Sequence, residues 1–217
     1  SSKNLTAGEG GIIITNNLDL AGECVSLHNC GRVQGKAWYE HYVTGGNYRL
    51  TEFQGALLNA QMDRLAEQAQ RREENGTYLS QRLAQVPGIT PQKRDELCTR
   101  HAYHLLPYRI DTAEFGISRD EFLAALVAEG VPSVFGYLYP LHRQPVFVNK
   151  AFGPYDGVSK HIDYAAAPCP NADALCTEQA AWLEQRFFLG TTQDMDDIAN
   201  AFEKVYENRA ALRSREA

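Results

Sequence analysis

Residues 2–15 read SKNLTAGEGGIIIT, a glycine-rich turn that runs into three consecutive isoleucines. β-Branched residues favour strands, and an unbroken apolar run is typical of a strand buried on both faces. We therefore expect residues 12–14 to form a short strand inside a covered sheet. Residues 16–50 contain no second strand pattern, so the neighbouring strands of that sheet are expected to come from elsewhere.

The segments that follow are predicted to be a helix, a long loop and a second helix. Apolar residues keep helical spacing over 19–29, whereas residues 31–48 mix glycine, aromatic and polar residues without a period. A loop of this length inside a compact domain is usually functional. Helical spacing then returns over 50–86, until Pro87-Gly88 stops the pattern, and a bend near Asn75-Gly76 is compatible with it.

A helix of that length usually connects two domains. We therefore expect one domain to end within it, so that residues 1–75 belong to a first domain and residues 76–217 form a second, smaller α/β domain. Length alone is compatible with one or two domains.

The second half is predicted to alternate strands and helices, which makes a small α/β layer that can cover itself. One helix is marked by a capping box at Ser118 and Glu121 and by a stop at Gly130. The expected elements are a strand over 103–110, a helix over 118–129, a strand over 131–139, an ordered loop over 140–167, a helix over 177–186, a buried strand over 187–189 and a helix over 191–212.

Composition places the chain among ordinary globular proteins. The sequence has 217 residues, of which 44% are hydrophobic and 10% aromatic, so a sizeable core can form and disordered, collagen-like and disulfide-scaffold classes are excluded. With 21 Lys+Arg against 27 Asp+Glu, the net charge is −6. An acidic chain without a basic patch gives no electrostatic attraction to nucleic acid, so we expect no nucleic-acid partner.

The sequence also argues against a membrane-spanning segment and against a metal site. No segment reaches the ~20 consecutive apolar residues of a membrane-spanning helix, and the first residues do not resemble a secretory signal, so a cytoplasmic location without a membrane partner is predicted. The five cysteines form no C-x-x-C pair and are expected to be free thiols. His101 and His104 have no metal-ligand partners in the pattern and are expected to pack or to cap.

Two features near the start of the chain carry possible chemistry. Residues 8–11 are rich in glycine, which lets backbone N–H groups approach an anion, but the spacing is not that of a P-loop and a tight turn before a strand explains it better. Lys3 is a solvated charge by default. If it is held beside the turn and desolvated, its free amine becomes a nucleophile toward a carbonyl carbon.

Four separated motifs, in this order and spacing, resemble the DegT/StrS-type sugar aminotransferases. They are SKNLTAGEGG at 2–11, GNYRL at 46–50 with EFQ at 52–54, QMDRL at 61–65 and YPLH at 139–142. The resemblance covers essentially the whole chain. It implies an α/β fold, namely the C-terminal part of the fold-type-I pyridoxal-phosphate-dependent aminotransferase fold, with the end of the large domain over 1–75 and the small domain over 76–217.

The resemblance also implies an activity. These enzymes use pyridoxal 5′-phosphate (PLP) to move an amino group from L-glutamate or L-glutamine to a nucleotide-linked keto-sugar or a keto-cyclitol, and they work as homodimers with active sites at the interface. The glycine block looks most similar to members that act on inosose-type cyclitols. The large-domain residues that hold the ring and phosphate are not found in this sequence, so the chain is expected to be a fragment that is inactive alone.

The resemblance assigns roles to four residues. Lys3 matches the Schiff-base lysine, and Asn47 matches the asparagine that reaches the phosphate of the partner subunit's cofactor. An alternative for Asn47 is a turn residue, with Arg49 pairing with an acid such as Glu52. Tyr139 and His142 match a loop that faces the substrate, although a loop histidine is as often a surface or capping residue.

Three alternatives remain from the sequence. A sugar dehydratase of the same fold that uses pyridoxamine phosphate replaces the lysine with histidine, so Lys3 argues against it. A non-catalytic or regulatory homologue is distinguished by loss of the aspartate that pairs with the pyridine nitrogen. A free-standing interaction domain is distinguished by where the native polypeptide begins.

Overall fold

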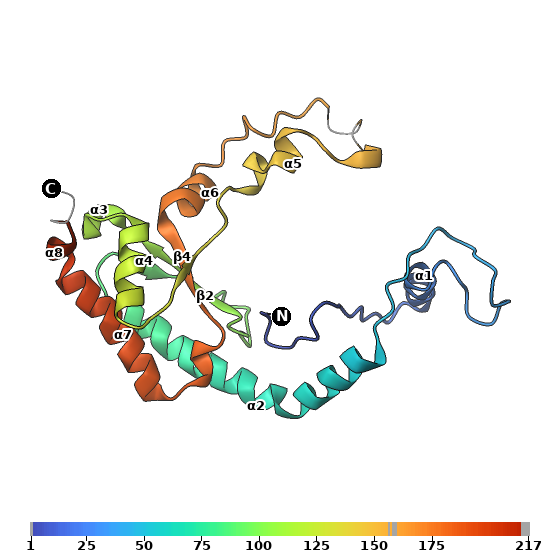
Figure 1. Ribbon diagram of the computed structural model, residues 1–217, viewed down its shortest axis with the longest axis horizontal. Coiled ribbons are helices and arrows are strands. Elements are labelled where there is room, and N and C mark those ends of the chain that lie inside the picture. Colours follow the sequence, from blue (N-terminus) through green and yellow to red (C-terminus); the bar gives the residue numbers. More distant parts are fainter. Residues whose placement is uncertain (1, 156, 158–159, 214–217) are drawn as a thin grey trace. The chain divides into compact units, whose positions relative to one another are not determined.

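The computed structural model describes residues 2–155, 157 and 160–213, and the chain divides into two compact units, Ser1–Ala66 and Glu67–Ala217 (Figure 1). The boundary falls inside one long helix, α2 (Glu52–Leu83). The domain division after residue 75 that the sequence predicts lies in the same helix.

The first unit has the predicted order of helix, loop and helix. α1 (Leu18–His28) begins at Asn17, whose side-chain oxygen accepts hydrogen bonds from the N–H groups of the first helical turn. The helix predicted over 19–29 is thereby confirmed. Residues 31–48 form the expected loop, and an isolated antiparallel bridge between Asn29 and Asn47 closes it.

The buried strand predicted over residues 12–14 is wrong for the described chain. These residues are in no strand, and Ile12, Ile13 and Ile14 are 84%, 70% and 86% exposed. A strand needs a neighbour to satisfy its backbone N–H and C=O groups. The strands that the structure describes all pair with one another in the second unit, so no partner strand is present beside these residues.

α2 runs unbroken through Asn75-Gly76, where the sequence was compatible with a bend. Gly76 serves packing instead, because a Cβ at this position would lie 2.5 Å from ring atoms of Tyr103. The glycine therefore allows an aromatic ring from the second unit's own core to lie directly on the helix.

The second unit is built on a four-stranded antiparallel sheet with the strand order β1-β2-β4-β3. Its strands are β1 (Ile89–Pro91), β2 (Leu105–Ile110), β3 (Val134–Phe135) and β4 (Ala180–Glu184). β2 and β4 form the centre, with Leu106 opposite Leu183 and Tyr108 opposite Ala181. These four residues share one face of the sheet and are buried, so the sheet is covered on that face.

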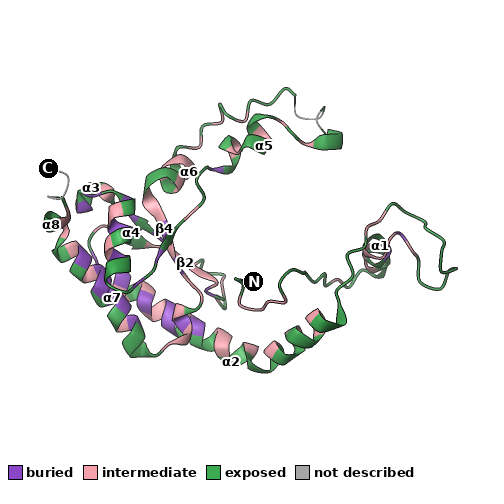
Figure 2. Cartoon of the chain, in the orientation of Figure 1, coloured by how far each residue is buried: buried purple, intermediate pink, exposed green. Residues whose placement is uncertain are grey.

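The core of the second unit lies between this sheet face and the helical segments that cover it (Figure 2). The Tyr108 ring contacts Phe202 edge-on at 5.2 Å between centroids, and Phe122 contacts Phe202 at 5.6 Å. The largest fully buried side chains are Phe115, Phe122, Phe188, Phe202, Leu79, Leu83, Leu106, Ile110, Leu126, Leu183 and Met195. The C-terminal part of α2 thus supplies one wall of this core.

The helix that begins after Ser118 is confirmed in detail. α4 (Arg119–Ala128) starts at a capping box in which Glu121 N–H donates to Ser118 Oγ at 3.2 Å and the Glu121 carboxylate accepts from Ser118 N–H at 2.6 Å. Gly130, with φ +83°, follows the helix as predicted. A one-turn helix before it, α3 (Thr112–Phe115), was not expected from the sequence.

The last predicted helix is divided in two. α7 (Thr192–Glu207) starts at a second capping box, where Asp194 accepts from Thr191 N–H at 2.6 Å and Asp194 N–H donates to Thr191 Oγ1 at 3.3 Å. The prediction of a single helix over 191–212 is wrong at its end, because α7 stops at Glu207 and a short helix, α8 (Arg209–Arg213), follows.

The helix predicted over 177–186 is wrong, because β4 occupies half of it. A π-helical turn at Leu175–Gln179 precedes the strand. Within β4, Ala181 and Leu183 alternate with half-buried residues and pair with β2. Hydrogen bonding to a central strand and burial of alternate side chains outweigh the weak helix preference of this segment.

Two further predictions fail around β4. Residues 187–189 form a short 3-10 helix rather than a strand, although Phe188 is fully buried as expected. Their backbone is held by a side chain, since Asn75 Nδ2 donates to the carbonyl oxygens of Phe188 at 3.0 Å and Gly190 at 2.9 Å. The strand predicted over 131–139 shortens to β3.

The described residues of the connection 140–167 contain more helix than the predicted loop. It holds a 3-10 turn at Leu141–Arg143, the helix α5 (Pro145–Val148) and a second 3-10 turn at Gly153–Tyr155. The helix α6 (Pro170–Ala174) follows it. A small aromatic cluster of Phe147, Phe152 and Tyr164, with centroids 5.4 to 5.9 Å apart, packs this connection on itself.

Candidate functional site

The four residues that the resemblance singles out fall into both units. Lys3 and Asn47 belong to the first unit, and Tyr139 and His142 belong to the second.

Two glutamines of α2 hold the segment that follows Lys3. Gln61 Oε1 accepts from Thr6 N–H at 3.2 Å, and Gln61 Nε2 donates to the Thr6 carbonyl at 2.7 Å. Two helical turns earlier, on the same face of α2, Gln54 Nε2 donates to the Glu9 carbonyl at 2.7 Å. The backbone from Thr6 to the glycine turn is thus fastened along α2.

Gln54 has a second role at the start of α2. Its Oε1 accepts from Thr51 N–H at 3.0 Å, and its own N–H donates to Thr51 Oγ1 at 3.3 Å. This is a capping box, so the same side chain begins the helix and contacts the glycine segment. Sequence reasoning missed both roles, yet T-x-x-Q before a helix and two glutamines seven residues apart are signals that the sequence contains.

Lys3 lies three residues before Thr6 and its side chain is exposed in the described chain. The described residues therefore do not supply the desolvation that would make its amine more nucleophilic. They supply a fixed backbone instead, because the hydrogen bonds at Thr6 limit how far the preceding residues can move.

Asn47 is placed by the end of α1. Cys30 N–H donates to the Gly46 carbonyl and Tyr48 N–H donates to the His28 carbonyl, both at 2.9 Å, on the two sides of the Asn29–Asn47 bridge. Asn47 therefore pairs with Asn29 in an isolated bridge between two segments of the chain and does not lie in a turn.

Two glycines allow this close approach. A Cβ on Gly45 would lie 2.5 Å from the Leu27 carbonyl oxygen, and a Cβ on Gly31, where φ is +80°, would lie 1.8 Å from the Val43 carbonyl oxygen. Both obstacles are backbone atoms that cannot swing aside. These glycines are therefore required for the loop to return against α1 at Asn47.

The Asn47 amide has a defined orientation. Arg49 Nε donates to Asn47 Oδ1 at 3.0 Å, and Arg49 contacts no carboxylate in the described structure, so its pairing with Glu52 is wrong. A guanidinium has donors only, so the amide atom facing it must be the oxygen. The Asn47 NH₂ group is consequently turned away from Arg49 as a donor, which fits an anionic group such as a phosphate.

In the second unit, His142 lies against an acid. Its Nε2 is 3.5 Å from Asp173 Oδ1, too long for a well-formed hydrogen bond, and Arg143 Nε reaches the same oxygen at 2.8 Å. The His142 side chain is only 10% exposed. Asp173, which the sequence did not single out, thus joins the 3-10 turn to α6.

Tyr139 lies at the start of that turn with its side chain half exposed. Its carbonyl oxygen accepts from Gln144 Nε2 at 3.2 Å. Tyr139 and His142 are therefore neighbours on one segment, with an exposed phenol beside a largely covered imidazole.

His101 packs and caps, as predicted. Its Nδ1 accepts from Tyr103 N–H at 3.0 Å, its ring lies 4.2 Å from the Tyr103 ring, and its backbone N–H donates to Glu73. Burial, the largest cause, lowers the pKa of His101 from its ordinary value. The imidazole is thus favoured in its neutral form.

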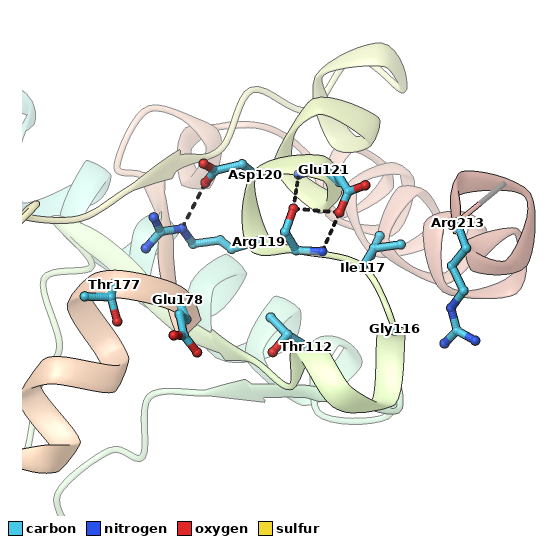
Figure 3. A pocket seen from close by; sticks show the side chains of 10 residues that line it. Thr112, Gly116, Ile117, Arg119, Asp120, Glu121, Thr177, Glu178 and Arg213 are labelled. Atoms are coloured by element: carbon cyan, nitrogen blue, oxygen red, sulfur yellow. Dashed lines mark hydrogen bonds and ion pairs between the residues drawn. The ribbon is translucent and has the colours of Figure 1, made fainter. Parts of the chain in front are cut away.

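A pocket of about 540 Å³ lies at the start of α4 and contains none of the four singled-out residues (Figure 3). Its two arginines are engaged locally. Arg119 donates to Asp120 and to the Cys176 carbonyl, and Arg213 donates to the Phe115 carbonyl from Nε and Nη2. These pairings stabilise helix ends.

Within the described ranges, no group of three or more metal-binding side chains is found, and none of the helices there has the length and apolar character needed to span a membrane. The five cysteines are free thiols, as expected.

Comparisons with known proteins agree with the sequence motifs. A family model for the DegT/DnrJ/EryC1/StrS aminotransferases matches residues 1–202. A putative L-glutamine:3-amino-2,3-dideoxy-scyllo-inosose aminotransferase of Streptomyces kanamyceticus is 31% identical over 219 residues, which cover 98% of this chain and 52% of that protein. A pleiotropic regulatory protein of Geobacillus stearothermophilus is 34% identical over 156 residues, covering 70% of this chain and 39% of that protein.

Among solved structures, 3-amino-5-hydroxybenzoic acid (AHBA) synthase matches with a TM-score of 0.77 and 28% identity, covering 95% of this chain and 52% of that one. The chain spans about half the length of the inosose aminotransferase and of AHBA synthase, and its fold is the C-terminal part of the family fold, as predicted. The chain belongs to the DegT/DnrJ/EryC1/StrS aminotransferase family.

Proposed function

We propose that the native protein containing this chain is a PLP-dependent aminotransferase that moves the amino group of L-glutamine, or of L-glutamate, to a keto-cyclitol or a nucleotide-linked keto-sugar. The observation that carries this proposal is the match over 98% of the chain to a relative named for glutamine and an inosose acceptor. Lys3 is the supporting residue, because a dehydratase of the same fold has histidine there.

The described residues suit the two ends of PLP. Lys3 offers a primary amine for the aldehyde, and Asn47 offers an NH₂ group that Arg49 turns outward for the phosphate. When bound, PLP supplies an electron sink for negative charge that develops at the donor's α-carbon. Lys3 Nζ would take the proton from the donor's α-carbon and deliver it to C4′ of the cofactor, a transfer for which the backbone that Gln61 holds at Thr6 would position the lysine.

The remaining roles concern the acceptor and the assembly. His142 and Tyr139 are proposed to contact the keto substrate from the small domain, residues 76–217, while residues 1–75 complete the large domain. We also propose a homodimer in which Asn47 serves the partner subunit's cofactor, and a cytoplasmic location.

The regulatory relative gives a second candidate, a homologue that has lost turnover and acts as a regulator. The native protein should therefore be incubated with PLP, L-glutamine and a panel of keto-cyclitols and keto-sugars, with amine products followed by mass spectrometry. Transamination with at least one acceptor supports the enzyme. PLP binding without any conversion of glutamine to its keto acid supports the regulator.

A further inference from the structure

Asn29 lies beside Asn47 and shares its arginine. The two residues oppose each other across an antiparallel bridge, which places their side chains on the same face. Arg49 donates from Nη1 to Asn29 Oδ1 at 3.1 Å and from Nε to Asn47 Oδ1 at 3.0 Å. One guanidinium therefore joins the two amides.

The donor-only guanidinium settles the orientation of both amides. Each oxygen faces Arg49, so each NH₂ group points away from it. Neither NH₂ group donates to another protein atom within the described part of the chain. Two amide donors are thus left available side by side, close to a single positive charge.

The backbone on both sides of the pair is held by hydrogen bonds. α1 ends at His28, and the hydrogen bonds from Cys30 and Tyr48 flank the bridge on either side. Because the two amides are held in place before any ligand arrives, little ordering entropy is lost when they bind one.

We propose that Asn29 is a second phosphate-binding amide and that Arg49 is a positioning residue that aims both amides at one phosphate group. The inference rests on the proposed function and identifies the ligand as the phosphate of PLP. Two neutral amides and one guanidinium suit an oxyanion, since hydrogen bonds to charged groups are stronger than those between neutral ones.

The test compares PLP with pyridoxal, which lacks the phosphate. Dissociation constants for both are measured by absorbance titration on the native full-length protein and on Asn29→Asp, Asn29→Ala and Arg49→Lys. Arg64→Lys is the matched control, because Arg64 is exposed on α2 and outside this cluster. We expect the three cluster variants to bind PLP about tenfold more weakly, while pyridoxal affinity and the Arg64→Lys protein stay unchanged.

Asn29→Asp separates a binding role from a structural one. The aspartate keeps the acceptor for Arg49 but loses the donor and adds a negative charge, so weaker PLP binding at an unchanged melting temperature supports the proposal. Unchanged PLP affinity in Asn29→Asp overturns it, as does an equal loss for PLP and pyridoxal.

Failure of the proposed function has a different signature. If the wild-type protein binds no PLP and borohydride leaves no pyridoxyl group on Lys3, the function and the inference fall together. If wild-type Lys3 is labelled and the cluster variants keep their PLP affinity, only the inference falls. Inorganic phosphate is also tested as a competitor of PLP. If each cluster variant loses affinity for inorganic phosphate by the same factor as for PLP, the cluster recognises the phosphate group itself.

Discussion

Gln61 pairs with the backbone of Thr6 through both ends of its side-chain amide, at 3.2 Å to the Thr6 N–H and 2.7 Å to the Thr6 carbonyl. A side chain thus takes the place that a neighbouring strand occupies in a sheet. The residues between Lys3 and the glycine turn are fixed to α2 by this pairing and by Gln54.

Changing Gln61→Glu should loosen this segment. The carboxylate keeps an acceptor for Thr6 N–H but faces the Thr6 carbonyl with a second acceptor, so one bond is replaced by repulsion. We expect faster hydrogen exchange at the Thr6 amide and several-fold slower labelling of Lys3 by PLP and borohydride. Gln85→Glu is the control, since Gln85 is exposed in the second unit, and equal behaviour of the two variants would contradict the role of Gln61.

Changing Gly31→Ala should displace the loop that carries Asn47. The new Cβ would lie 1.8 Å from the Val43 carbonyl oxygen, in addition to the strain of φ +80°. Gly35→Ala is the matched control, because Gly35 has φ +81° and open space around its added Cβ. Gly35→Ala should cost about 1 kcal/mol of unfolding free energy through backbone strain alone.

Both glycine variants are measured by chemical denaturation and by PLP titration. Gly31→Ala should lose more unfolding free energy than Gly35→Ala and should also bind PLP more weakly. Equal losses in the two variants would mean that the close approach at Gly31 does not position Asn47.

The capping box of α7 should make stability depend on pH. Hydrogen bonds from the Thr191 backbone, and then from its hydroxyl, lower the pKa of Asp194 below its ordinary value in the folded state. The unfolded state therefore binds the proton more readily, and the stabilisation is present above the unfolded-state pKa and lost as pH falls through the folded-state pKa.

Asp194→Asn tests this directly. At neutral pH the variant should unfold at lower denaturant concentration than wild type, and the gap should close as the pH falls through the acidic range. Asp197→Asn is the control, because it removes an equal negative charge from a position on the same helix that is away from Thr191. A gap for Asp194→Asn that is constant with pH would rule out the carboxylate as its source.

Local signals in the sequence predicted those parts of the fold that depend on local chemistry. Ser118 and Glu121 form the expected capping box, and the last helix begins where it was expected, at a capping box of Thr191 and Asp194, because capping needs only residues within one turn. β4 was mistaken for a helix because its conformation depends on pairing with β2, about 75 residues earlier in the chain. The turn at Phe188 likewise depends on Asn75, which no local pattern connects to it.

In the candidate site, too, the sequence motifs identified residues but not the contacts between distant residues. The motifs contained Lys3, Asn47, Gln54 and Gln61, but the contacts among them are set by the folding of the loop onto α1 and of the glycine segment onto α2. Asn29 precedes Asn47 by a whole loop, and only the bridge brings the two amides to one guanidinium. The strand predicted for the isoleucines 12–14 was wrong because a strand needs a neighbouring strand to pair with.

The role of Lys3 is tested most directly by reducing the native protein with borohydride in the presence of PLP and mapping the modified peptide. We predict a single pyridoxyl group on Lys3. A pyridoxyl group on Lys36 or Lys160 in its place, or an unmodified Lys3 in a protein that transaminates, would contradict the account.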